Sequence, residues 1–247
     1  MFKEYFILLL LGHVLGDFYF QTKKMSDNKK KKFGWVILHG LTYGLVMVVI
    51  CFLFGQVKLV VSACAATLIH MLIDIMKYIY LKLCKEKTYV KECSVFFIDQ
   101  ALHFMSIMAI SYVFVLSFGE ILSGSIVENF FLTINVSEIV VLAWILALLI
   151  ISKPANIMIQ RFLSAYRPKS NVEHKDDNNA GRLIGTVERV IILILISIGQ
   201  YSSIGLVLTA KSIARYDRIS KEKDFAEYYL LGTLISTLIV IVTSFIL

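Results

Sequence analysis

The sequence predicts an all-α fold: a polytopic membrane helical bundle with about eight transmembrane helices, six to eight being the expected range. Two observations lead to this prediction. Of the 247 residues, 58% are hydrophobic and 17% are charged, and the mean hydropathy is +0.76. This apolar share is far above that of an ordinary soluble domain. Several apolar runs also reach about 20 residues, the length that an α-helix needs to cross a bilayer.

Hydropathy and lysine positions place the spans in order along the chain. In the first half, four spans are expected at about 3–21, 34–54, 59–77 and 94–117, so that 1–117 is a four-helix membrane core. The remaining segment, 118–247, is expected to hold C-terminal membrane helices joined by basic cytoplasmic loops. Its spans are expected at about 138–157, from 183 to a turn at 200–203, at 204–215 and at 228–246. Because 204–215 is short, a re-entrant or interfacial segment is the alternative there.

The basic residues indicate an orientation in the membrane. Lysines and arginines gather at 23–32, 77–91 and 160–182, whereas the connection 118–137 contains neither. Cytoplasmic loops carry an excess of Lys and Arg, so we expect a multi-pass protein of the plasma membrane with both termini outside. The net charge of +7 follows this membrane pattern, and no nucleic-acid partner is expected.

Three pairs of histidine and aspartate lie inside the apolar runs with one common spacing. They are His13 with Asp17, His70 with Asp74, and Asp99 with His103. Residues four apart share one face of an α-helix, and ionisable groups inside a membrane need a partner, an ion or a water-filled cavity. The third pair is reversed in order, and its span runs in the opposite direction. The three histidines are therefore expected at one depth in the membrane, and the three aspartates at another.

The depths suggest one shared site. At a rise of about 1.5 Å per residue, the three histidines lie roughly 10–12 Å below the cytoplasmic edge and the three aspartates roughly 5–7 Å below it. His39 falls between the two layers. These seven side chains suit a divalent metal such as Zn²⁺, Mn²⁺ or Fe²⁺, with up to two ions. A proton relay is the alternative for the same set, and any single histidine is equally well explained as an interhelical hydrogen-bond partner.

A second polar group lies in the C-terminal half at the same membrane face. Arg189 with Lys211 suits an anionic substrate, although Glu188 and Arg189 can also pair with neighbouring helices, and membrane anchoring alone explains Arg215. The expected substrate-binding residues are Lys77, Gln100, Arg189, Lys211 and Arg215, and the expected catalytic residues are Glu188 and Gln21.

The first His/Asp motif also carries a family resemblance. The run His13-Val14-Leu15-Gly16-Asp17-Phe18-Tyr19-Phe20-Gln21 resembles the opening of the domain of unknown function 3307 family, a group of bacterial integral membrane proteins. The motifs His39-Gly40, His70-x3-Asp74-x2-Lys77 and Asp99-Gln100-x2-His103 match the same pattern. The resemblance covers about 1–117 and implies fold and membrane location, but it brings no activity. A looser similarity links these helices to membrane-bound metal-dependent hydrolases, whose usual Pro-Asp-x-Asp-His type of cluster this sequence lacks.

The leading functional hypothesis is a metal-dependent hydrolase of the cytoplasmic leaflet. The basic residues favour an anionic, phosphorylated or esterified amphiphile, such as a phosphate-bearing lipid, as its substrate. The main alternative is a divalent-cation or proton transporter that uses the same His/Asp site; against it, the sequence shows no paired broken helices and places the site away from the midplane. A haem-binding electron carrier and a purely structural protein remain further alternatives. A carboxylate one turn from each paired histidine suits a harder ion than haem iron.

Overall fold

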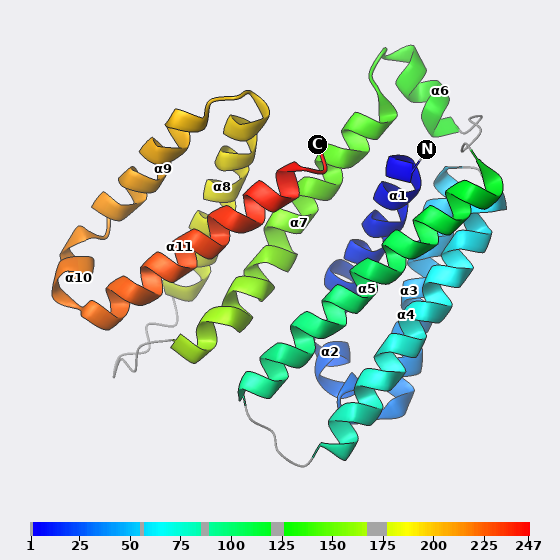
Figure 1. The fold of residues 1–247 in the computed structure, drawn as a ribbon, viewed down its shortest axis with the longest axis horizontal. Helices are drawn as coiled ribbons and strands as arrows, with labels where there is room; N and C mark the ends of the chain where they lie inside the picture. The colour runs from blue at the N-terminus through cyan, green and yellow to red at the C-terminus, as the bar shows by residue number, and fades with distance from the viewer. Residues whose placement is uncertain (1, 55–56, 85–88, 120–125, 167–176) are drawn as a thin grey trace. The chain divides into compact units, whose positions relative to one another are not determined.

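The fold is helical throughout the part of the chain that the structure describes. This structure is a computed structural model that describes residues 2–54, 57–84, 89–119, 126–166 and 177–247. The expected connections at 77–91, 118–137 and 160–182 lie outside these ranges in part, at 85–88, 120–125 and 167–176. Every regular element in the described ranges is a helix, which confirms the all-α class (Figure 1). The chain divides into two compact units, Met1–Leu146 and Ala147–Leu247, which are described separately below.

Five helices of the described chain are long and apolar enough to cross a membrane. They lie within α3 (Phe33–Leu53), α4 (Val57–Leu83), α5 (Tyr89–Phe118), α7 (Glu138–Leu163) and α11 (Lys223–Ser244). A sixth candidate is the bent pair Phe2–Phe20 with Lys23–Lys29. The helical membrane bundle is therefore confirmed. The expected count of about eight is not confirmed, since the described residues give five to six.

Two C-terminal helices explain the lower count. α8 (Asp177–Ser197) carries Arg182, Glu188 and Arg189 within its length. α9 (Tyr201–Ile213) has 13 residues, which is about 20 Å of helix against a hydrocarbon core of about 30 Å. The turn between them lies at 198–200, slightly before the predicted 200–203, and α9 begins at Tyr201. Gly199 has a φ of 73°, and the Gln200 N–H donates to the Leu195 carbonyl, a common way for a helix to end at glycine.

The first unit is built on a closed ring of helices. α1 (Phe2–Val14) packs against α3 and α5, and α4 also packs against α3 and α5 (Figure 1). The short α6 (Ile126–Thr133) follows later in the same unit. α1 lies deepest, since Tyr5 and Ile7 are fully buried and Leu8 to Leu11 are nearly so. Polar side chains on the inner faces of this ring are consequently removed from solvent.

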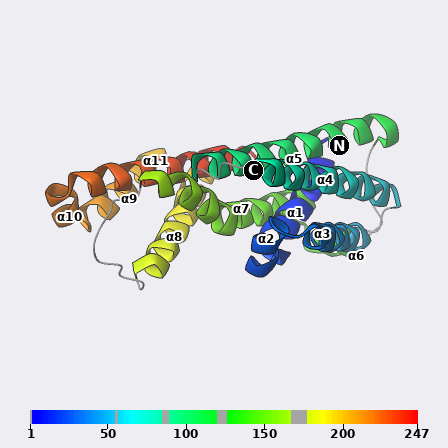
Figure 2. The same ribbon diagram turned by 90° about the horizontal axis from the view of Figure 1, so that it is seen from below.

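The first span does not end as the regular helix that the sequence predicts. Residues Leu15–Phe20 form a wider π-helical turn, η1, and the chain then bends by 95° into α2 (Lys23–Lys29) (Figure 2). The Thr22 side chain caps α2 by accepting a hydrogen bond from the Met25 N–H at 3.2 Å. π-Helical turns are rare in proteins, and those that occur often lie at functional sites. This one contains Asp17.

The second unit consists of the C-terminal part of α7 and four helices that follow it. α8 packs against α9 and α11, and α10 (Tyr216–Lys221) packs against the start of α11. A single 3-10 turn, η2 (Ser164–Tyr166), ends α7. Gly232 of α11 faces Leu163 of α7, where an added Cβ would lie 3.1 Å from the leucine Cδ1. At this point a small residue lets α11 lie close to α7.

Replacing Gly16 with alanine is expected to destabilise the first unit. A Cβ at this position would lie 2.7 Å from Cδ2 of Tyr43, and that ring is stacked on His70, so it has little freedom to retreat. Overpacking of this kind costs about 1–3 kcal/mol, and we expect Gly16→Ala to lower the thermal unfolding temperature in detergent. Gly34→Ala is the matched control, because nothing lies within 4 Å of its added Cβ. Equal unfolding temperatures for the two variants would contradict this packing.

Candidate metal centre

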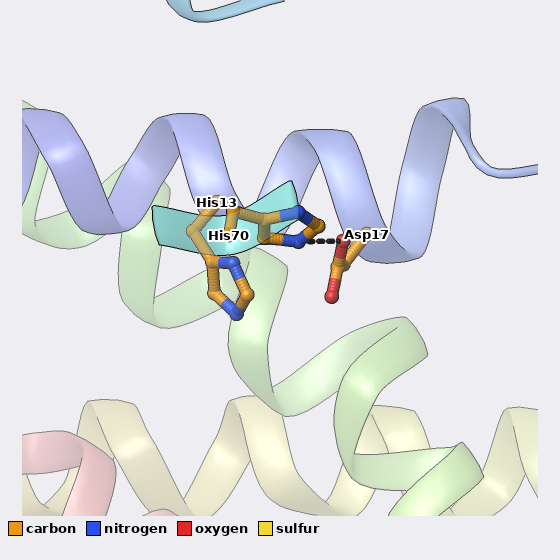
Figure 3. Close-up of side chains that lie close together, drawn as sticks. All are labelled: His13, Asp17 and His70. Atoms are coloured by element: carbon orange, nitrogen blue, oxygen red, sulfur yellow. Dashed lines mark hydrogen bonds and ion pairs between the residues drawn. The ribbon is translucent and has the colours of Figure 1, made fainter. Parts of the chain in front are cut away.

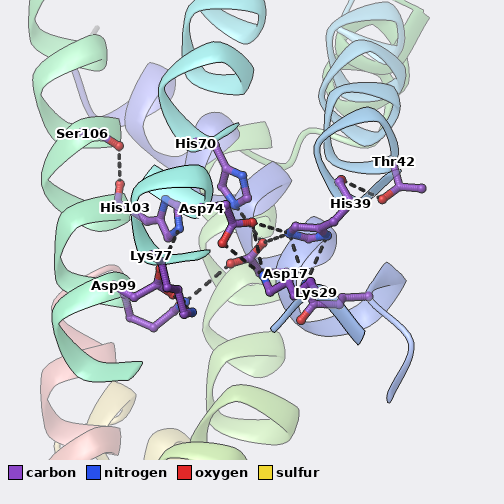
Figure 4. A network of polar contacts seen from close by, with 12 residues as sticks. Asp17, Lys29, His39, Thr42, His70, Asp74, Lys77, Asp99, His103 and Ser106 are labelled. Atoms are coloured by element: carbon purple, nitrogen blue, oxygen red, sulfur yellow. Dashed lines mark hydrogen bonds and ion pairs between the residues drawn. The ribbon is translucent and has the colours of Figure 1, made fainter. Parts of the chain in front are cut away.

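The seven expected metal-ligating residues converge in the first unit. Their side chains come from the end of α1, from η1, and from α3, α4 and α5. Figure 3 shows His13, and Figure 4 shows the other six. All are buried, with exposed fractions from 0% to 9%. They are His13, Asp17, His39, His70, Asp74, Asp99 and His103. Histidine and aspartate are rarely buried without a partner, so the contacts of each group decide what this cluster can do.

Asp17 is the centre of the hydrogen-bonding network. Its Oδ1 atom accepts hydrogen bonds from Nε2 of His70 at 2.9 Å and from Nε2 of His39 at 3.1 Å. Figure 3 shows the bond to His70, with His13 beside it. When Nε2 carries the proton in a neutral imidazole, Nδ1 keeps a free lone pair. The Asp17 carboxylate therefore sets His70 in the tautomer that leaves Nδ1 as an acceptor or a metal ligand.

Four buried polar atoms of the cluster have no hydrogen-bond partner among the described residues. They are Nδ1 of His13, Nδ1 of His70, Nε2 of His103 and Oδ1 of Asp99. The last two lie 3.6 Å apart, too far for a hydrogen bond. A buried polar atom without a partner costs about 1–3 kcal/mol. A bound cation fits this set, because each of these atoms is a donor of electron pairs to metals.

Three overlapping groups place their ligand atoms within 4.8 Å of one another. The groups are His13 with Asp17 and His70, His39 with His70 and Asp74, and Asp74 with Asp99 and His103. Imidazole nitrogen and carboxylate oxygen together suit Zn²⁺, Mn²⁺ and Fe²⁺. His70 joins the first two groups and Asp74 joins the last two. A carboxylate has two oxygens, so Asp74 can serve two neighbouring ions.

Two lysines contact the carboxylates of this cluster. Nζ of Lys29 lies 3.2 Å from both Oδ1 and Oδ2 of Asp74, and Nζ of Lys77 lies 2.6 Å from Oδ2 of Asp99 (Figure 4). Their side chains are 12% and 17% exposed. The sequence analysis selected Lys77 but missed Lys29, which is one of six lysines between 23 and 32. Only the bend after η1 shows which of them turns back toward the site.

Neutral side chains hold the ligands from the sides. Nε2 of Gln21, expected to be catalytic, lies 3.1 Å from Nδ1 of His39. Nε2 of Gln100, expected to bind substrate, lies 3.3 Å from Oδ2 of Asp99. The Tyr43 ring stacks on His70 with centroids 3.8 Å apart, a contact that sequence reasoning missed because Tyr43 lies in an ordinary apolar run. In this geometry both glutamines contact ligand side chains.

Arg189 of the second unit is satisfied by neighbouring helices. Its Nε atom donates to the Ile151 carbonyl at 2.6 Å, Nη1 to Ser236 at 3.2 Å, and Nη2 to Asn156 at 2.6 Å and Thr186 at 3.1 Å. Arg189 is buried, with 2% of the residue exposed. It therefore ties α7, α8 and α11 together. The sequence offered no signal for the partners Asn156 and Ser236.

Lys211 and Glu188, two other expected residues of the second unit, pair with each other. Nζ of Lys211 lies 2.5 Å from Oε2 of Glu188 and 5.5 Å from the centroid of the Tyr229 ring. Glu188 is buried, and this ion pair joins α8 to α9. Arg215 is half-buried at the junction of α9 and α10. Within the second unit, these contacts form an interhelical network of their own.

Replacing Arg189 with methionine is expected to destabilise the protein by at least about 2 kcal/mol, because the buried carbonyl and amide oxygens that it binds lose their donor. Denaturant or thermal unfolding in detergent measures the effect. Arg182→Met is the control, since Arg182 is exposed and makes one hydrogen bond of 3.3 Å to Gln160. Similar stability of both variants would show that the Arg189 network is not needed for folding.

Comparison with known proteins gives one family. The family model described as Protein of unknown function (DUF3307) matches residues 5–132. This match covers more than half of the chain and includes every residue of the His/Asp cluster. No curated protein and no solved structure matches the chain. The chain belongs to the DUF3307 family.

Proposed function

We propose that this protein is an integral membrane, metal-dependent hydrolase that acts on an anionic, phosphorylated or esterified amphiphile at the cytoplasmic leaflet of the plasma membrane. The observation behind the proposal is a set of three groups of His and Asp residues. Within each group, the candidate ligand atoms lie within 4.8 Å of one another. Four atoms of the cluster that have no hydrogen-bond partner among the described residues support the proposal, because a bound cation would satisfy them.

The residues around the proposed metal have different roles. His70 and Asp74 are the shared ligands of neighbouring groups, which favours a two-ion site of Zn²⁺, Mn²⁺ or Fe²⁺. A bound divalent ion of this kind polarises a phosphoryl or acyl oxygen and activates water. Asp17 orients the imidazoles of His70 and His39, and the glutamines hold ligand side chains in place.

Access to the cluster supports an enzyme more than a transporter. The two lysines at its edge are 12% and 17% exposed, whereas the ligands are 0–9% exposed. On the other side, α1 continues from His13 with Gly12 and the buried run Leu8–Leu11. The hydroxyls of Ser106 and Ser111 on α5 donate to carbonyls of their own helix. A head group can thus approach from the lysine side, and the described helices offer no polar path beyond the histidines.

A divalent-cation or proton transporter is the second candidate, and one observation favours it. The first span is interrupted by η1 and then bends by 95°, and broken helices bind ions in many transporters. The break lies next to Asp17 and His39, so the same ligands serve either function.

Metal content tests the proposed site. We expect His70→Ala and Asp99→Ala to lose at least one equivalent of metal, because each removes a ligand from a group of three. Elemental analysis of detergent-purified protein measures this loss, and Asp27→Ala, an exposed aspartate of α2, is the control. Equal metal content in the wild type and all variants would indicate a structural role for the cluster.

Reconstitution separates hydrolysis from transport. In liposomes, the wild type is expected to hydrolyse a phosphorylated or esterified amphiphile in a metal-dependent way and to move no divalent ions, because apolar side chains close the far side of the cluster. Release of the hydrolysed product and entry of Mn²⁺ are measured in parallel. Mn²⁺ entry that disappears in Asp74→Ala would overturn the enzyme and support the transporter.

A further inference from the structure

The carboxylates that are available for metal already hold two ammonium groups. Lys29 contacts both oxygens of Asp74 at the same distance, 3.2 Å. Lys77 contacts one oxygen of Asp99, and the other, Oδ1, accepts no hydrogen bond from any residue that the structure describes. Asp74 and Asp99 both belong to the candidate metal groups. A divalent ion bound by these oxygens would therefore compete with the lysines for the same charge.

The net charge of the cluster shows what such competition would produce. With neutral imidazoles, the three aspartates and two lysines sum to −3 + 2 = −1. One divalent ion changes this sum to +1, and two ions change it to +3. A buried excess of positive charge needs an anion, and both ammonium groups lie at the more exposed edge of the cluster.

From these contacts we infer that Lys29 and Lys77 form a phosphate-binding site that becomes available when metal enters the cluster. The inference rests on the proposed function and names the group that this site recognises in its substrate. With Asp74 and Asp99 serving as metal ligands, the ammonium groups of Lys29 and Lys77 would be free to bind the oxygens of a phosphate. A lysine suits this exchange, because its charge lies at the end of a flexible four-carbon stem. Metal and phosphate then bind in that order, each raising the affinity for the other.

The position of Lys29 in the fold supports this role. The 95° bend and the cap at Thr22 direct α2 back toward α4, and of the neighbouring lysines, Lys30 pairs with Glu92 at a site where both side chains are more than one third exposed. An ordinary basic loop would leave all these lysines in solvent. The chain instead places one ammonium group within the polar cluster of the membrane helices.

Metal affinity tests the first step. Wild type, Lys29→Met and Lys30→Met are titrated with Mn²⁺ and Zn²⁺ against a chelating indicator in detergent. Because Lys29→Met removes the competing ammonium group, it is expected to bind metal about tenfold more tightly than the wild type, whereas Lys30→Met is expected to match the wild type. Lys29→Gln, which keeps a neutral hydrogen-bond donor, serves as a second variant if Lys29→Met does not fold. Equal affinities in all folded variants overturn the inference.

Phosphate binding tests the second step. Inorganic phosphate and a short-chain phosphatidic acid are titrated calorimetrically into metal-free and Mn²⁺-loaded protein. Binding is expected only in the loaded protein and is expected to weaken about tenfold in Lys29→Met and in Lys77→Met. Tighter binding of the phosphatidic acid identifies a lipid head group, and equal binding identifies free phosphate. Binding that is independent of metal, or unchanged in both variants, overturns the inference.

Failure of the inference and failure of the proposed function give different results. If the wild type binds no Mn²⁺ or Zn²⁺, both are wrong. If it binds metal with the same affinity as Lys29→Met and the loaded protein does not bind phosphate through the lysines, the metal site stands and the phosphate site is wrong.

Discussion

The cost of burying charge inside apolar helices determines the architecture of the first unit. Three aspartates and four histidines lie on the inner faces of a ring of helices, where an isolated carboxylate is strongly disfavoured. Two lysines offset this cost. The bend after η1 brings Lys29 to Asp74, and Lys77 pairs with Asp99. Gly16 also supports the cluster, because its lack of a side chain leaves room for the Tyr43 ring that packs on His70.

Among the described residues, both units contain buried polar atoms without a hydrogen-bond partner, and these atoms differ in chemical kind. Arg189 donates four hydrogen bonds to neighbouring groups of the second unit, as expected of a group that joins helices. Of the described atoms without a hydrogen-bond partner, those in the first unit include imidazole nitrogens of His13, His70 and His103. Those in the second unit are the hydroxyl oxygens of Tyr229 and Thr233 and the carboxylate of Glu188, which is ion-paired with Lys211. Such atoms persist in a folded protein when an ion, water or ligand satisfies them. The hydrogen bonds of Arg189 support a structural role for its network, and the clustered imidazole nitrogens fit the metal binding that is proposed for the His/Asp cluster.

Sequence alone predicts much of this arrangement, and its limits have physical causes. The i, i+4 pairs and the opposite direction of their spans predict that His13, His70 and His103 come together, because both depend on regular helix geometry. The π-helical turn at Asp17 and the bend at Thr22 depend on local packing that no periodicity reports. Lys29 is hidden in a run of lysines that reads as a solvated loop. The span count of about eight is not confirmed. α8 carries charged residues within its length, and α9 has 13 residues, in the stretch for which the sequence also offers a re-entrant or interfacial alternative.

X-ray absorption spectroscopy of the purified, metal-loaded protein tests the central claim most directly, because it reports the ligands of the metal itself. The account predicts a first shell of nitrogen and oxygen atoms with multiple scattering from at least two imidazoles, since the candidate groups combine histidine nitrogen with aspartate oxygen. Replacement of His70 should reduce that imidazole signal. A shell of oxygen atoms alone, unchanged in His70→Ala, would show that the metal binds elsewhere and would contradict the account.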